Sequence, residues 1–294
     1  MVARPACIVR RMRNYTDVTK ARRVLANLHG TGLHGRVALT VAGSIFAVIA
    51  LIGWQTAVSA QAPAAVSETA QSDAAFDLTG NWVSVVTEDW RFRMVTPPKG
   101  DYASVPLNPE GTKVADAWSP SMDGQCEAYG MAGLLRLPTR LRISWQDPQS
   151  LRIETDAGVQ TRLLHFEQGT SVPAERSLQG FTRAEWERPG GRGRNGGPAA
   201  AGGRRPLAPG GVMKATTTML RQGWLRKNGV PYSADAEVTE YFDLFSLPNG
   251  DTWFSVTAIV RDPKYLRQDF VTSVHFKKEV DGSKWRPTPC KASS

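Results

Sequence analysis

The run Ala236–Glu279 decides the fold; it reads AEVTEYFDLFSLPNG, DTWFSVTAIVRDPKYLRQD and FVTSVHFKKE. These three segments are rich in Val, Thr, Phe, Tyr and Trp, which suit a pleated and half-buried strand. Asn249-Gly250-Asp251 predicts a hairpin turn after the first, because Gly accepts a positive φ and Asn tolerates one. Asp262-Pro263 marks the next break. Such strands need a further face to pack on, so we expect the rest of the chain to complete the sheet.

Six more strand-like segments precede this run, at residues 78–86, 140–145, 151–155, 160–166, 178–187 and 212–220. Strands do not alternate with crossover helices, which argues against an α/β fold. Asn108-Pro109 is typical of a helix start, and a second helical segment is expected over 123–135. The pattern predicts a mainly β protein: a single antiparallel up-and-down β-barrel with short helical insertions.

Two resemblances support this expectation. Gly80-Asn81-Trp82 is similar to the G-x-W motif that opens lipocalin-type barrels, a family in which the tryptophan packs across the closed end. Residues 81–96 (NWVSVVTEDWRFRMVT), 97–105, 223–233 (GWLRKNGVPYS) and 275–290 resemble a family of secreted bacterial proteins of unassigned function. The second resemblance covers most of 76–290, implies export and a lipocalin-like barrel, and supplies no catalytic residues.

The N-terminal 60 residues have the pattern of a leader. A basic start precedes the apolar run 37–54, and Val58-Ser59-Ala60 is a small-x-small cleavage pattern. The alternative is an uncleaved membrane anchor. We therefore expect a leader over 1–60, a linker over 61–75 and a barrel domain over 76–294, exported to the periplasm or beyond. Arg188–Gly211 is low in complexity and is predicted to be a loop within that domain.

Charge and cysteine content limit the partners. The net charge is +9, but most of the excess lies in the leader and in the 188–211 loop, so a basic nucleic-acid-binding face is not expected. Beyond the leader the chain has two cysteines, Cys126 and Cys290. In an oxidising compartment two cysteines favour a disulfide, and two unpaired thiols are the alternative.

Glu240 and His275 are the candidate catalytic residues. Val238 and Phe242 flank Glu240 on one strand face, and burial there would raise its pKa toward the range useful for acid–base work. The alternatives are a Glu paired to a nearby Arg or Lys, and a His with a structural role. No metal site, cofactor site or nucleotide-binding loop is expected, because the ligand spacings and glycine motifs that they require are missing.

The remaining candidates would bind a ligand, and they are Trp90, Arg91, Arg93, His165, Thr217, Tyr241 and Trp253. Trp90-Arg91-Phe92-Arg93 could stack on and pair with an anionic or aromatic ligand. Its alternative is a strand edge with Trp90 and Phe92 in the core and both arginines in solvent.

Three functions follow from these residues. The leading hypothesis is an exported barrel that binds a small, mostly apolar or aromatic molecule in its lumen. The second is a cofactor-free lyase, isomerase or hydrolase that uses Glu240 and His275. The third is an envelope interaction protein whose Gly/Arg loop contacts partners or an anionic surface. The oligomeric state is not predicted.

Overall fold

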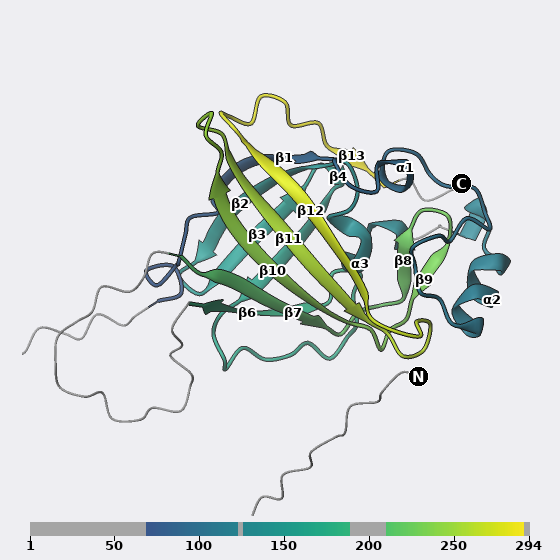
Figure 1. Cartoon of the computed structure of the whole chain (residues 1–294). Coiled ribbons are helices and arrows are strands. Elements are labelled where there is room, and N and C mark those ends of the chain that lie inside the picture. The colour runs from purple at the N-terminus through teal and green to yellow at the C-terminus, as the bar shows by residue number, and fades with distance from the viewer. Residues whose placement is uncertain (1–68, 123–125, 189–209, 291–294) are drawn as a thin grey trace, which may run out of the picture. The chain divides into compact units, whose positions relative to one another are not determined.

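The fold is a closed β-barrel, seen in a computed structural model that describes residues 69–122, 126–188 and 210–290. Its strands are ordered β1-β12-β11-β10-β7-β6-β5-β3-β2 (Figure 1). Their bounds are β1 Gly80–Val85, β2 Arg140–Asp147, β3 Ser150–Thr155, β5 Gln160–His165, β6 Phe181–Glu187, β7 Val212–Thr218, β10 Glu237–Ser246, β11 Thr252–Arg261 and β12 Phe270–Glu279. The mainly β prediction is confirmed, and each expected strand is present.

The expectation of an antiparallel barrel is wrong at one place. β5 and β6 run parallel, pairing Leu164 with Thr182 and His165 with Arg183. Nine strands close the ring, and directions cannot alternate around an odd number of strands, so at least one neighbouring pair must be parallel. The connection after His165 therefore carries the chain back along the barrel before β6 begins.

The predicted hairpin between β10 and β11 is confirmed. Gly250 has φ 86°, which a glycine adopts without steric cost. Its amide donates to the carbonyl of Leu247, and the Asn249 side chain accepts from the amide of Asp251 at 3.1 Å. This turn sets the β10–β11 register, in which Phe242 pairs with Val256. In the next pair of strands Val256 lies opposite Val274 of β12.

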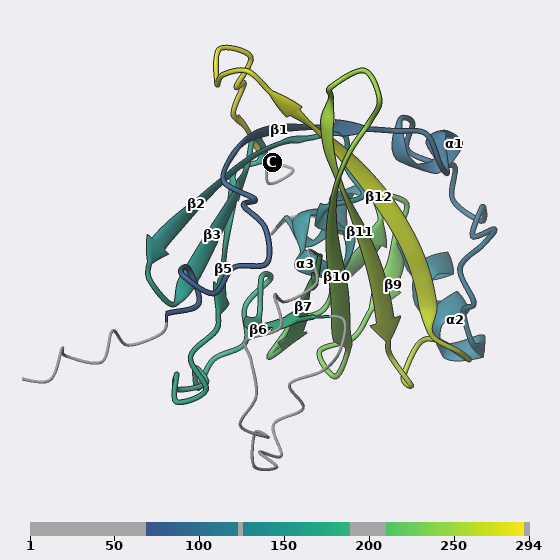
Figure 2. The same ribbon diagram turned by 60° about the vertical axis from the view of Figure 1, so that its left-hand side comes forward.

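The barrel interior is filled by side chains from facing walls. Figure 2 shows β2, β3 and β5 on one side and β10, β11 and β12 on the other. Trp82 of β1 is fully buried between them, 4.7 Å from the ring of Phe254, and its Nε1 donates to the carbonyl of Leu78. Phe254 also stacks on Phe276 at 4.9 Å.

Short helices and a small hairpin gather at one end of the barrel (Figures 1 and 2). They are α1 Trp90–Arg93, α2 Pro109–Ala117, α3 Met131–Leu134, the 3-10 turns Pro120–Met122 and Glu127–Tyr129, and the hairpin β8 Gly223–Arg226 with β9 Val230–Tyr232. The expected cap is confirmed, since the Asn108 side chain accepts from the amide of Gly111 at 2.8 Å. The β8–β9 hairpin was not expected from the sequence.

An apolar cluster joins this end to the barrel. Met131 of α3, Leu225 of β8 and Tyr232 of β9 pack with Val238 of β10 and Phe270 of β12. The cluster fixes the short elements against the strand ends, so side chains that they carry are held in defined positions.

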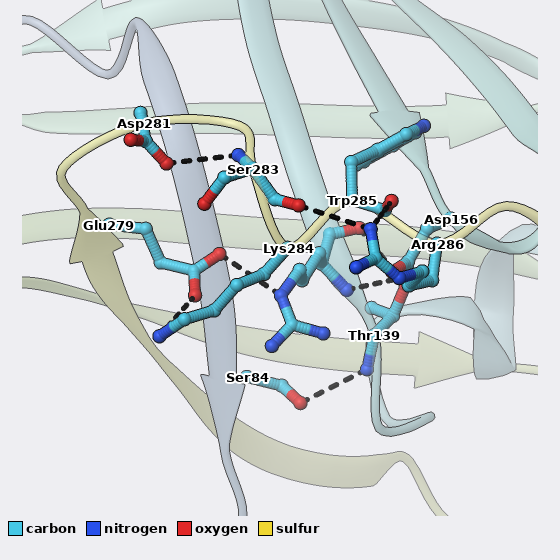
Figure 3. Close-up of polar contacts among 10 residues, drawn as sticks. Ser84, Thr139, Asp156, Glu279, Asp281, Ser283, Lys284, Trp285 and Arg286 are labelled. Atoms are coloured by element: carbon cyan, nitrogen blue, oxygen red, sulfur yellow. Dashed lines mark hydrogen bonds and ion pairs between the residues drawn. The ribbon is translucent and has the colours of Figure 1, made fainter.

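The C-terminal segment lies across the outside of the barrel. Figure 3 shows Lys284 beside Glu279, with Trp285 and Arg286 on the side of Asp156. Trp285 stacks under the Arg142 guanidinium at 4.3 Å, and β13 Thr288–Pro289 pairs with β4 Ala157–Gly158. The segment ends in a disulfide between Cys126 and Cys290, so the first of the two alternatives for the cysteines holds.

Three expectations lie outside the described residues. They are the leader over 1–60, most of the linker that follows it, and residues 189–209 of the Gly/Arg loop. Within the described ranges, no helix is both long and apolar enough to cross a membrane.

Candidate functional site

Three buried arginines come together at the end of the barrel that carries the short elements. Arg93 ends α1, Arg136 follows α3, and Arg226 ends β8. Their exposed fractions are 6%, 6% and 4%, which is unusual for a residue type that is almost never fully buried unless paired. We call this group the arginine pocket.

Two of the three have acidic partners. Arg93 pairs with Glu88, and its Nε donates to the carbonyl of Arg136 at 2.7 Å. Arg136 donates from Nη2 to Asp89 at 2.9 Å. Asp89 has φ 51°, a left-handed conformation that aspartate tolerates better than most residues. The turn before α1 thus places both carboxylates against the pocket.

Arg226 is held differently. Its guanidinium lies 4.0 Å from the centre of the Phe92 ring, and Nη1 donates to the carbonyl of Ala103 at 2.7 Å. Among the described residues no carboxylate forms an ion pair with it. Burial, and then the charge of Arg136, lower the pKa of Arg226 to about 10. The site therefore carries a positive charge that is poorly compensated.

Several guanidinium donors in the pocket have no acceptor in the described structure. They are Nη2 of Arg93, Nη1 of Arg136, and Nε and Nη2 of Arg226. Leaving buried donors unpaired costs free energy, so an acceptor in their midst is strongly favoured. A cavity lies at this place, bordered by the arginines, Phe92 and Leu225. The cavity offers ≈ 20 Å³ to the centre of a water-sized sphere. One water molecule needs about 10–15 Å³ on the same measure.

Glu88 links the pocket to the outer wall. One carboxylate oxygen pairs with Arg93, and the other lies 3.2 Å from Nδ1 of His275. Burial opposes the ionisation of Glu88. The hydrogen bond from Thr87, the charge of Arg93 and the hydrogen bond from His275 outweigh burial and lower its pKa. Glu88 is therefore a carboxylate that screens Arg93.

The two predicted catalytic residues are not brought together. Glu240 faces the interior, whereas His275 follows the inward Val274 and so faces outward. Glu240 forms a buried bidentate pair with Arg162 of β5, with Nη2 to Oε2 at 2.7 Å and Nη1 to Oε1 at 3.3 Å. The enzyme hypothesis needs both side chains in the lumen, and strand alternation instead places them on opposite faces of the wall.

The other candidates are scattered. Thr217 faces the interior, where its hydroxyl bonds that of Thr182 at 2.8 Å. Tyr241 and Trp253 alternate with inward neighbours and lie on the outer face. His165 stacks on Phe181 at 5.1 Å; burial, with the charge of Arg183, lowers its pKa.

The segment from Trp90 to Arg93 is a short helix rather than a strand edge. Trp90 is 64% exposed and Arg91 pairs with Asp101 at the surface, whereas Arg93 is buried. The strand-edge alternative is therefore wrong, because the tryptophan lies outside the core and one arginine lies inside it. Binding of an anionic or aromatic ligand by this segment stays a prediction. The sequence suggests Arg93 as a residue that pairs with an anionic ligand. It does not suggest Arg136 or Arg226, because single arginines outside the expected strands show no pattern.

The described residues contain no group of three or more His, Cys, Asp and Glu side chains placed to hold a metal ion. No family model, curated protein or solved structure matches this chain. The arginine pocket is therefore the feature of the described structure that indicates a function.

Proposed function

We propose that this protein binds a small anionic molecule at the arginine pocket. The observation that carries the proposal is the set of buried guanidinium donors without acceptors, which surround a cavity. Guanidinium groups present a planar fork of donors that matches carboxylate and phosphate oxygens. In this proposal the barrel serves as a rigid support, and the ligand lies at its end.

A lumenal site for an apolar molecule is the weaker proposal. The barrel architecture is compatible with it, but Trp82, Phe254 and Phe276 already pack against one another inside. The Arg162–Glu240 pair also crosses the interior. The proposal of a Glu240–His275 enzyme loses its support because the two groups face opposite ways, and the Gly/Arg loop of the interaction hypothesis lies largely outside the described residues.

Export is part of the proposal. A disulfide between Cys126 and Cys290 is typical of proteins in oxidising compartments, and the leader expected over 1–60 would direct the chain there.

The direct test is NMR of arginine Nε–Hε groups during titration with sodium acetate at constant ionic strength. We expect the Arg226 resonance to shift and saturate, because its unpaired Nε borders the cavity. Arg226→Met should abolish binding while keeping an unbranched side chain against Phe92, and Arg226→Lys should weaken it by losing the planar fork.

The matched control is Arg152→Met. Arg152 lies on β3, is 40% exposed, and pairs with Glu154 away from the pocket. This variant should bind acetate as the parent does. The proposal is overturned if the Arg226 signal responds to acetate no more than the Arg152 signal does.

A further inference from the structure

Exposed apolar side chains occur in α1 and just after it, and one of them lines the arginine pocket. Trp90, Met94 and Val95 are 64%, 57% and 65% exposed, and Val95 lines the cavity. Few large apolar residues of the described chain are this exposed, and these three fall within six consecutive residues. Grouped exposed apolar side chains beside a polar site are typical of a binding surface.

The charge of the pocket sets the charge of its ligand. Arg93 and Arg136 are matched by Glu88 and Asp89, which leaves Arg226 as the charge to be balanced. Lys227 also borders the cavity, but its ammonium is turned to Tyr129, 3.4 Å from the hydroxyl and 5.1 Å from the ring centre. One negative charge on the ligand would balance Arg226, whereas two would leave an excess of negative charge in the pocket.

The dimensions agree with a small head group. The space of ≈ 20 Å³ is small, so we expect a planar group with two oxygens to fit it better than a tetrahedral group with four. Apolar side chains continue from this space to the surface, since Phe92, Leu137 and Leu225 line it and Val95 lies at its opening. A ligand with its anionic head inside would therefore lay its remaining part on apolar side chains.

We infer that the ligand is an amphiphilic monocarboxylate, with its carboxylate held by Arg93, Arg136 and Arg226 and its apolar body against Phe92, Met94 and Val95. This inference rests on the proposed function, because it names the class of anion that the same site takes. The site is outside the barrel lumen, between α1, α3 and β8.

The test is calorimetry of the protein with acetate, butyrate, hexanoate and octanoate at constant ionic strength, with octanol and octyl phosphate as comparison probes. Each methylene that becomes buried should strengthen binding about fourfold. We expect affinity to rise along the carboxylate series, octanol to bind far more weakly than octanoate, and octyl phosphate to bind no more tightly than octanoate.

Variants locate the apolar contact. Val95→Asn should flatten the rise in affinity with chain length, whereas Val172→Asn changes an exposed valine that does not line the pocket and should leave the series as in the parent. Arg226→Met should lower octanoate affinity to that of octanol.

The outcomes separate this inference from the proposed function. If acetate saturates the Arg226 signal and affinity is flat from acetate to octanoate, the inference fails and anion binding stands. Octanol binding as tightly as octanoate, or octyl phosphate binding more tightly, also overturns the inference. If no carboxylate perturbs Arg226, both fail.

Discussion

At the residue scale, two buried charged residues of this protein differ in how far their hydrogen-bonding groups are paired. Glu240 is 2% exposed, but its partner Arg162 satisfies it with two hydrogen bonds. Arg226 is buried to a similar degree and retains donors without acceptors in the described structure. Burial alone therefore does not identify a functional group; what matters is whether the hydrogen-bonding capacity is already used.

The Arg162–Glu240 pair gives a prediction at this scale. Glu240→Gln should lower the free energy of unfolding by about 3–5 kcal/mol, because it leaves the buried Arg162 without a countercharge. Urea unfolding monitored by circular dichroism measures the change. Adding Arg162→Met to this variant should recover much of the loss.

The matched control is Glu154→Gln, which removes a carboxylate from the partly exposed pair with Arg152. Its expected cost is under about 1 kcal/mol. Equal effects of the two substitutions would show that the interior pair is not a structural element of the barrel.

At the element scale, the last three strands of the barrel form two local hairpins. β10 and β11 pair along their whole length through a tight turn. β11 and β12 pair from Trp253 with Lys277 to Val260 with Phe270, across the connection that begins at Asp262. β6 and β7 are also a complete antiparallel pair, from Phe181 with Thr218 to Glu187 with Val212. The long insertion between β6 and β7 is therefore not needed to set their register.

Replacing residues 189–209 by a short Gly-containing turn tests this statement. Shortening a loop saves about 0.6 kcal/mol of closure free energy for each halving, so the melting temperature should stay the same or rise by a few degrees. Differential scanning calorimetry measures it. A scrambled sequence of the same composition should melt as the parent does. A fall of more than about ten degrees would mean that the insertion packs against the barrel.

At the scale of the whole molecule, the C-terminal segment is tied to the barrel at three places. Trp285 stacks with Arg142, the amide of Thr288 donates to the carbonyl of Asp156 at 2.8 Å, and Cys290 is bonded to Cys126. The disulfide joins residues separated by 164 positions, so it closes most of the folded chain into one loop.

Cys290→Ala should therefore lower the free energy of unfolding by about 2–4 kcal/mol, chiefly by freeing the unfolded chain. It should also make the segment after Glu279 the first site of limited proteolysis. Intact mass of the parent protein before and after alkylation without reductant provides the direct check. Labelling of both Cys126 and Cys290, located by peptide mapping, would refute the bond, and the Cys290→Ala variant, in which Cys126 is labelled, is the control.

The sequence by itself determined the strands, the Asn249-Gly250 hairpin and the Asn108 helix start, because side-chain alternation, turn residues and caps act over a few neighbouring positions. It also pointed to Arg93 and to the cysteine pair. Only the tertiary structure decided the closure of β1 on β12, the parallel pair forced by an odd number of strands, and the faces of Glu240 and His275 relative to each other. It alone assembled the arginine pocket, since Arg93, Arg136 and Arg226 come from three short elements that meet through long-range packing, and such packing leaves no periodic signal along the chain.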